Sequence, residues 1–541
     1  MVWNSGKLVV IFLFAAASVG LAQVNRYIVF FKDKAGTTFT VNKPLDFLSQ
    51  RAVDRRIRQA ISVSEMDLPV NPNYVKGVRD LGINTFFTTK WMNGVLVQCD
   101  ASSIPAIENL SFVDRVEFVA PYERLLVEGR KHVDLKTKEL KTASSTKAQL
   151  QMIGLDEMHA AGYEGDNILI GIFDGGFLGV NTAPPFQHIF DENRINLSAS
   201  KDFVTNSKNV FQYDEHGTEV FSVIAAYQDG FYSGGSYDAD YQLFVTEDVG
   251  SEYRIEEYNW LFAAERADSA GVDVVNSSLG YYDFDYTSMD YEKGAMDGKT
   301  TIVSRAAQRL ADKGVIVVCS AGNEGGISWQ IITAPADAKD VLAIANVNSA
   351  GQRSGSSSIG PSADGRIKPD VAALGVNTSV IRPNGTLGTA SGTSLAAPLI
   401  TSLAAGVWQR YPNLTNIEVI EAIRKSASQA NNPDKFLGYG IPNFKAVVNY
   451  VEDSHQENIF EIYPNPITKD TITIKPNDPG QVGSCKVEVL TAQGQTVYQA
   501  DVNFSWLNRT YTSNVTGLPA GLYFMRILWG DRKFTFRMIK V

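Results

Sequence analysis

The chain has 541 residues, of which 44% are hydrophobic and 20% are charged, so it can bury several cores and is not disordered in bulk. At about 150 residues per domain, roughly three domains are expected. The net charge of -10 excludes a protein whose main task is to bind nucleic-acid phosphates. Residues 24–126 carry +2 and residues 150–450 carry -16. The two parts are either electrostatic partners, or the acidic part is an ordinary solvated surface.

The first 22 residues have the pattern of a signal peptide. Lys7 precedes an apolar run from Leu8 to Ala17, and the small residues Gly20 and Ala22 present a cleavage site before residue 23. The apolar run is shorter than the ~20 residues that a membrane-spanning helix requires. Export of the chain is therefore expected.

Cysteine is scarce, and Cys99, Cys319 and Cys485 fall one in each large region. This spacing indicates no disulfide framework, although an exported chain would be allowed one. Packing or bound ions must then supply the stability. Cys319 lies in the apolar run GVIVVCSAG and is expected to be a buried small hydrophobe.

Residues 23–126 have the pattern of a small α+β domain. Strands are predicted at RYIVFF, GVLVQCD and RVEFVA, and helices at PLDFLSQRAVDRRIRQ, NYVKGVRDLG and SSIPAIENLS. Residues 127–149, rich in Lys and Ser, are predicted to form an exposed linker that contains a maturation cleavage site.

In residues 150–450, continuous apolar strands alternate with longer amphipathic segments, as in NILIGIFD, QLFVTED, EEYNWLFAAERADSAG and VIVVCSAGN. The pattern predicts an α/β fold, a doubly wound and mostly parallel sheet covered by helices on both faces. Ligands of such sheets bind beyond the carboxyl ends of the strands. Asp174 and Asn323 follow strands there. Residues 458–541 contain short strands separated by Gly, Pro and Asn turns, and predict a small all-β sandwich.

Nucleophilic hydrolysis by a serine requires a hydroxyl, an imidazole, a carboxylate to orient it and donors for the oxyanion. Asp174 ends the strand ILIGIF, His216 starts an amphipathic helix in DEHGTEV, and Ser394 begins a helix in ASGTSLAAP. Asn323 stands in a glycine-rich loop. Taken singly, each residue has an ordinary explanation. Asp174 and Asn323 could be turn residues, His216 a packing or surface residue, and Ser394 a helix cap. Together they follow the order Asp, His, Ser.

The motifs FDGG, HGTEV, VVNSSLG, AGNEG, KPDVAALG and GTSLAAP resemble those of subtilisin-like serine endopeptidases over residues 150–450. The resemblance implies that Asp174 orients the imidazole, His216 is the general base and then acid, Ser394 is the nucleophile and Asn323 is an oxyanion donor. It further implies that the segment 276–280 pairs with extended substrate. The walls of the primary specificity pocket would be Ser278, Leu279, Gly280, Ser320, Ala321 and Gly322.

Two positions depart from the family pattern. Glu219 replaces the second histidine of HGTHV, and Leu395 replaces the methionine after the nucleophile. Neither change removes a member of the triad, although Glu219 adds charge near His216.

The flanking regions resemble parts of the same kind of protein. Residues 23–126 resemble the ferredoxin-like inhibitory propeptide of these proteases. IYPNP, GLPAGLYFMRI and the final FRMIKV resemble the type IX secretion sorting domain. The alternative for residues 458–541 is a substrate-binding β-sandwich.

The expected function is that of a secreted or cell-surface serine endopeptidase, made as a zymogen and exported by the signal peptide and then across the outer membrane. Its expected partners are protein or peptide substrates, its own propeptide and the type IX secretion machinery; a monomer that binds no nucleic acid is expected. A catalytically silent, peptide-binding or adhesive relative is the alternative. An α/β-hydrolase esterase would need the order Ser, Asp, His.

No cofactor is expected for the chemistry. The acidic loops TEDVGSEYRIEE and YYDFDYTSMDYE could supply oxygen ligands for calcium as a structural ion, as the resemblance implies, or could be solvated surface. The aromatic residues of the second loop could also form the rim of the cleft. Metal ligands are left unassigned.

Overall fold

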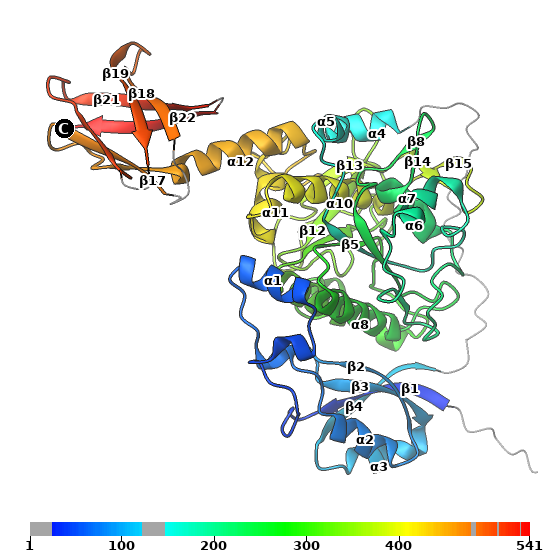
Figure 1. The fold of residues 1–541 in the computed structure, drawn as a ribbon. Coiled ribbons are helices and arrows are strands. Elements are labelled where there is room, and N and C mark those ends of the chain that lie inside the picture. The colour runs from blue at the N-terminus through cyan, green and yellow to red at the C-terminus, as the bar shows by residue number, and fades with distance from the viewer. Residues whose placement is uncertain (1–23, 122–145, 478–482, 506–507, 531) are drawn as a thin grey trace, which may run out of the picture.

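Three structural units follow one another along the chain (Figure 1). The computed structural model describes residues 24–121, 146–477, 483–505, 508–530 and 532–541. The predicted signal peptide and nearly all of the predicted linker lie outside these ranges. The last residues of that linker fall in helix α4 (Lys147–Met152), where Gln149 is buried.

The N-terminal domain is a four-stranded sheet in the order β2-β3-β1-β4, with β1 antiparallel to both of its neighbours. Its strands are β1 (Val24–Phe31), β2 (Asn84–Thr89), β3 (Gly94–Asp100) and β4 (Val113–Pro121), and its helices are α1 (Gln50–Arg58), α2 (Pro72–Arg79) and α3 (Ile104–Glu108). The helix predicted from PLDFLSQRAVDRRIRQ is divided, because Ser49 caps α1 by accepting the N–H of Ala52 (3.1 Å). Strand β2 was not predicted, since NTFFTT is a half-exposed edge strand.

The central domain is built on a seven-stranded sheet in the order β13-β12-β11-β10-β5-β9-β6, and every pairing in it is parallel. Its strands are β5 (Leu169–Asp174), β6 (Lys201–Asp202), β9 (Asp240–Val245), β10 (Val274–Ser277), β11 (Ile316–Ser320), β12 (Leu342–Val347) and β13 (Val371–Leu374). Two small hairpins accompany it, β7 (Tyr227–Gln228) with β8 (Tyr232–Ser233), and β14 (Thr378–Ile381) with β15 (Leu387–Ala390).

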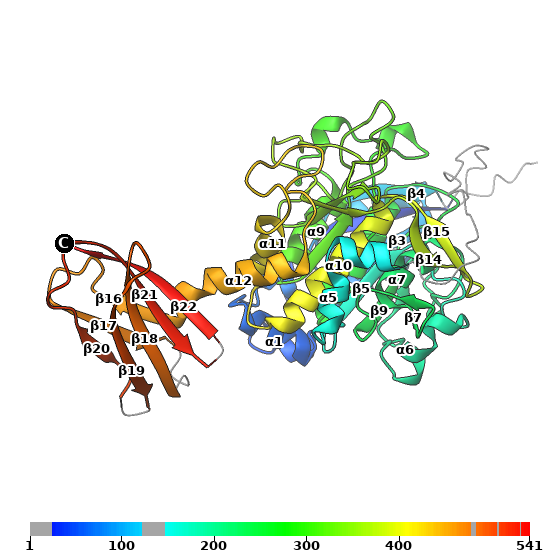
Figure 2. The same cartoon turned by 90° about the horizontal axis from the view of Figure 1, so that it is seen from above.

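Helices cover both faces of this sheet, which confirms the doubly wound prediction (Figures 1 and 2). The helices of this domain are α4, α5 (Leu155–Ala160), α6 (Gln187–Asp191), α7 (His216–Ala225), α8 (Ile255–Ala270), α9 (Ile302–Asp312), α10 (Thr393–Arg410), α11 (Asn416–Lys425) and α12 (Phe444–Ile459). Successive strand residues alternate between two cores: Ile172 packs with α7 and α10, whereas Phe173 packs with α8 and α9. The strands are apolar throughout because both faces are buried.

The C-terminal domain is the predicted β-sandwich. One sheet has the order β16-β17-β20 and the other β19-β18-β21-β22, and one hydrophobic core lies between them. The strands are β16 (Phe460–Tyr463), β17 (Thr471–Pro476), β18 (Gly483–Thr491), β19 (Thr496–Phe504), β20 (Tyr511–Asn514), β21 (Gly521–Trp529) and β22 (Arg532–Lys540). In both views the sandwich lies beyond the end of α12, apart from the seven-stranded sheet (Figures 1 and 2).

The N-terminal domain lies against helices α8 and α9 through one face of its sheet, and α2 and α3 cover the other face (Figure 1). Buried ion pairs cross this interface at the C-terminal end of α8. Arg55 and Arg56 contact the carboxylate of Asp268 at 2.7 and 2.8 Å, and Lys90 contacts it at 3.1 Å. Burial alone would raise the pKa of Asp268, but these cations hold it at about 2. The two domains are therefore electrostatic partners.

Among the described residues, no helix combines the length and apolar character needed to cross a bilayer. The three cysteines are free thiols, each buried in a different domain.

Candidate active site

The end of β5 and the start of α7 bring Asp174 and His216 together. Nδ1 of His216 lies 2.8 Å from Oδ1 of Asp174, and the N–H of Gly175 donates to the same oxygen at 2.8 Å. Asp174 is completely buried. A side chain on Gly217 would collide with Asp174 and the carbonyl of Gly176, so glycine is what lets α7 begin against the strand end.

The pKa values of this pair reflect burial and mutual attraction. Burial raises the pKa of Asp174, and the neighbouring imidazole opposes that rise. For His216, burial lowers the pKa, but the carboxylates of Asp174, Asp214 and Glu247 outweigh it and raise the value to about 9. The pair therefore favours an imidazolium, the species that a general base becomes once it has accepted a proton.

Ser394 lies in the first turn of α10 and is 6% exposed. A Cβ added to Gly392 would lie 2.9 Å from Ser394 Oγ and 3.6 Å from Asn323 Nδ2, so the two predicted groups converge on this glycine. The N–H and hydroxyl of Thr393 donate to Asn323 Oδ1 at 2.9 and 3.1 Å. The oxygen end of the amide is thus held on α10, and its NH2 end is the one that can face an oxyanion.

No hydrogen bond joins His216 to Ser394 in the described part of the chain. Such bonds are commonly long in enzymes without substrate and tighten in the complex. The structure therefore groups the predicted residues as two pairs, Asp174 with His216 and Ser394 with Asn323.

Pro398 has no N–H, so the carbonyl of Ser394 lacks its usual helical partner. The hydroxyl of Ser278 donates to that carbonyl at 2.9 Å. Ser278 also accepts from Asn276 Nδ2 at 3.1 Å, and Asn276 Oδ1 accepts from Thr401 at 2.9 Å. This chain of hydrogen bonds fixes the first turn of α10 against the end of β10.

Two departures from the family pattern have structural partners. Glu219 is buried in α7 and forms an ion pair with Arg382, which follows β14. Sequence reasoning missed Arg382 because it lies 163 positions away with no motif to mark it. Leu395 is fully buried in the core beneath the site.

The predicted substrate-pairing edge is shorter than expected. Asn276 and Ser277 belong to β10, whose backbone already pairs with β5 and β11 on its two sides. Substrate cannot add a strand there, so the part of the 276–280 segment that is beyond the sheet is Ser278, Leu279 and Gly280.

The two predicted walls of the specificity pocket lie side by side. Ser320 Oγ donates to the carbonyl of Leu279 at 3.5 Å. Thr333 stands between them, since side chains on Gly280 or Gly322 would collide with it. Thr333 Oγ1 is buried without a hydrogen-bond partner among the described residues. Sequence reasoning missed Thr333, which lies in no recognised motif.

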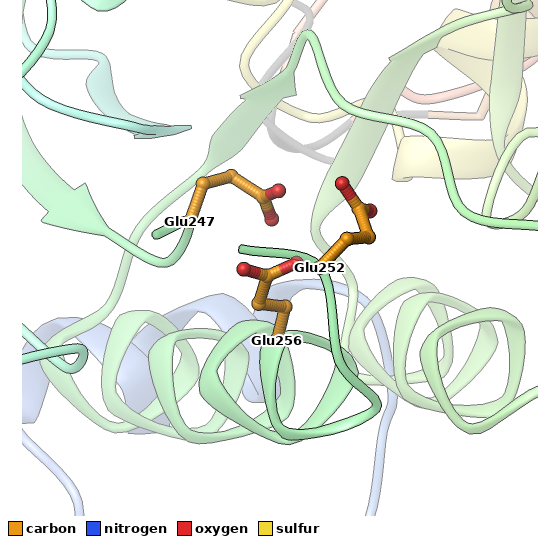
Figure 3. Close-up of side chains that lie close together, drawn as sticks. All are labelled: Glu247, Glu252 and Glu256. Carbon is orange, nitrogen blue, oxygen red and sulfur yellow. The ribbon is translucent and has the colours of Figure 1, made fainter. Parts of the chain in front are cut away.

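A cavity of about 550 Å³ opens beside Asp174 and His216, with Ser278, Leu279 and Gly280 along one wall. The acidic loop TEDVGSEYRIEE lines another wall and brings Glu247, Glu252 and Glu256 together, with carboxylate oxygens within 4.8 Å of one another (Figure 3). Burial raises the pKa of Glu247 to about 7 and that of Glu256 well above its usual range. Such a cluster suits a cation, either a divalent ion or a basic side chain. Calcium as a structural ion stays a prediction.

Three family models match successive parts of the chain. The model of the subtilase family matches residues 165–440, slightly more than half of the chain. The chain belongs to the subtilase family. A model described as "Peptidase S8 propeptide domain, Bacteroidota" matches residues 26–137, and one described as "Secretion system C-terminal sorting domain" matches residues 461–541.

Individual relatives are more distant. The chain is 28% identical over 311 residues to the subtilisin of Bacillus pumilus, covering 56% of this chain and 99% of that protein. It is equally identical to subtilisin NAT of Bacillus subtilis subsp. natto, covering 56% and 71%. A crystal structure of an epidermin leader peptide processing serine protease from Staphylococcus aureus has a TM-score of 0.55 at 15% identity. It covers 79% of this chain and 99% of that one, a likeness that shows the fold.

The subtilase is thus a subtilisin-like serine protease made with a propeptide and a type IX sorting domain. The N-terminal domain is that propeptide, seen here docked on α8 and α9. The sorting domain indicates secretion or display at the cell surface.

Proposed function

We propose that Asp174, His216 and Ser394 form the catalytic triad of a secreted endopeptidase, with Asn323 in the oxyanion hole. The observation that carries the proposal is the 2.8 Å bond between Asp174 and His216 at the carboxyl edge of the sheet. Ser394 begins a helix near the same edge, where free N–H groups favour developing negative charge.

In the proposed reaction, Ser394 Oγ attacks the peptide carbonyl while His216 accepts its proton. Asp174 holds the imidazole and stabilises the resulting imidazolium. The tetrahedral oxyanion is bound by Asn323 Nδ2 and the backbone N–H of Ser394. His216 then protonates the leaving amine, and water hydrolyses the acyl-enzyme by the same steps in reverse. Every proton transfer uses a group of this chain.

We further propose the route by which the enzyme matures. A signal peptide directs export, the propeptide stays docked until the enzyme cuts between the two domains, and the sorting domain is recognised by the type IX machinery for passage across the outer membrane. The mature enzyme acts as a monomer on protein or peptide substrates.

The test compares the purified wild type with Ser394→Ala by intact mass, N-terminal sequencing and digestion of casein. The wild type is expected to shed residues up to the 127–149 region and to digest casein, and the variant to stay full length and inert. Labelling by a fluorophosphonate, which reacts only with an activated serine, should be lost in the variant. Self-processing of pure Ser394→Ala protein would contradict the assignment.

A further inference from the structure

Acidic side chains predominate among the described residues that line the cavity beside Asp174 and His216. Its lining contains eight carboxylic side chains and no lysine or arginine. The eight are Asp174, Asp214, Glu247, Asp248, Glu252, Asp283, Asp285 and Glu324. The remaining lining is glycine, serine, valine, leucine and tyrosine, apart from His216. A cavity of this composition has a strongly negative potential, because low-dielectric walls focus the field of the lining charges.

Two acids of this lining, Glu247 and Glu252, lie beside a third acid that is buried. Glu256 reaches from the first turn of α8 toward Glu247 and Glu252 (Figure 3). Glu256 is 1% exposed, and its Oε1 accepts the N–H of Asp248 at 3.1 Å. Its other oxygen, Oε2, has no hydrogen-bond partner among the described residues. A buried carboxyl oxygen without a partner is costly, and a donor from outside the fold would remove that cost.

The place of the cavity indicates that this donor is part of the substrate. One wall is Ser278–Gly280, the segment beyond the sheet that can pair with an extended peptide. That segment is also a wall of the predicted primary specificity pocket, so it holds the residues that precede the scissile bond. Side chains from that stretch of peptide would project over the carboxylates.

A basic side chain fits the cavity better than a single ion does. One divalent ion binds its oxygen ligands at about 2.3 to 2.6 Å and would use only the three clustered glutamates. The other carboxylates, such as Asp214, Asp283, Asp285 and Glu324, are spread along the rest of the lining. A flexible lysine or arginine can meet acids along its whole path, and each charge-assisted bond adds affinity.

The chain itself carries a peptide of this chemistry. The segment between propeptide and protease domain, where the maturation cut is predicted, includes Arg130, Lys131, Lys136, Lys138 and Lys141. It is the first peptide that the enzyme would have to cleave.

We propose that this protease selects peptides with lysine or arginine among the residues that precede the scissile bond, and that Glu247, Glu252 and Glu256 receive the cationic group. The proposal rests on the proposed function, because it assumes that cleavage occurs at Ser394 beside this cavity.

The experiment uses the mature enzyme in a buffer that contains EDTA, with fluorophosphonate titration to count active sites. Peptides differ at one position before the scissile bond, which holds lysine, its uncharged analogue norleucine, or glutamate. Per active site, kcat/KM is expected to be about 10- to 100-fold higher for lysine than for norleucine at one position at least. Glutamate is expected to be the worst of the three.

Three variants assign that preference to the cluster. Glu247→Gln with Glu252→Gln should reduce the ratio between lysine and norleucine peptides to near one, and Glu252→Lys should shift the preference toward glutamate. Glu421→Gln, an exposed acid on α11, is the matched control and should keep the wild-type ratio.

The outcomes are distinguishable. A wild-type enzyme that is labelled at Ser394 but shows no preference for lysine overturns this inference and leaves the proposed function standing. Absence of labelling overturns the proposed function instead. A preference that appears only when calcium replaces EDTA, or that survives the double variant, assigns the cluster to a metal ion or to the fold and also overturns the inference.

Discussion

The two ends of helix α8 both carry a buried acid, and among the described residues only the acid at the C-terminal end, Asp268, forms ion pairs with buried cations. At the C-terminal end, Asp268 meets Arg55, Arg56 and Lys90 of the propeptide. At the N-terminal end, Glu256 lies beside Glu247 and Glu252, and one of its oxygens has no hydrogen-bond partner among the described residues.

The difference follows from the helix as well as from the partners. Negative charge is favoured at a helix N-terminus and disfavoured at a C-terminus. Asp268 stays ionised because of its neighbouring cations, whereas burial raises the pKa of Glu256 well above its usual range, so that a bound cation would favour its ionised form. The first end is suited to holding a propeptide, and the second to sampling successive substrates. The following predictions test this contrast, first by substitution and then by pH.

Asp268→Asn is expected to weaken the binding of the propeptide to the protease domain. The change leaves Arg55, which is 1% exposed, without its buried ion-pair partner, which typically costs about 3 to 5 kcal/mol. Arg56 loses one of its two buried partners and keeps Asp67 at 3.2 Å. The dissociation constant of the processed complex should then rise by roughly 100- to 1000-fold, or more. Native mass spectrometry of the self-processed enzyme on serial dilution measures this.

The control for that measurement is again Glu421→Gln, which removes an exposed acid of the same domain that pairs with Lys425 of its own helix. It should dissociate like the wild type. If Asp268→Asn keeps its propeptide at the same dilution, the buried ion pairs are not what holds the two domains together.

Asn323→Ala is expected to lower the catalytic rate without changing propeptide binding or the preference for lysine peptides. Loss of one oxyanion donor typically lowers kcat by about 100- to 1000-fold. Propeptide affinity and the ratio between lysine and norleucine peptides should stay as in the wild type, since Asn323 contacts Thr393 of α10 and belongs to neither acidic region. A change in KM larger than the change in kcat would show that Asn323 acts in binding instead.

The catalytic candidates and the central sheet could be predicted from the sequence. Asp174 and Asn323 follow apolar strands, and His216 and Ser394 begin helices, so local patterns placed each candidate at one edge of a parallel sheet. Continuous apolar runs such as β5, separated by amphipathic helical segments, made that sheet predictable as well.

The ion-pair partners of the buried charges could not be predicted from the sequence. Asp268 pairs with residues more than 170 positions away, and Glu219 pairs with Arg382 across a similar span. The sequence does not distinguish an acid that is buried in an ion pair from one that is exposed to solvent. It therefore left open whether the negative charge of residues 150–450 belonged to a partner-binding surface or to a solvated surface. The sequence also did not show that the backbone of Asn276 and Ser277 is hydrogen-bonded to β5 and β11 within the sheet. The segment expected to pair with substrate is shorter for that reason.

The last prediction uses pH, because the groups involved titrate in separate windows. His216 must be neutral to accept the proton of Ser394, and its pKa of about 9 means that kcat/KM rises with pH up to that value. Below it, activity should fall about tenfold per pH unit. Asp268 behaves oppositely: its pKa is about 2 in the folded protein and about 3.9 unfolded, so its stabilisation is complete above pH 4 and is lost between about 4 and 2. At pH 5 the enzyme should be nearly inactive while Asp268 still holds the propeptide. The kcat/KM profile from pH 5 to 10 tests the first statement, and with only five histidines in the chain, NMR titration of Ser394→Ala assigns the pKa directly. A value for His216 at or below 6.5, or release of the propeptide at pH 5, would contradict the separation of the two windows.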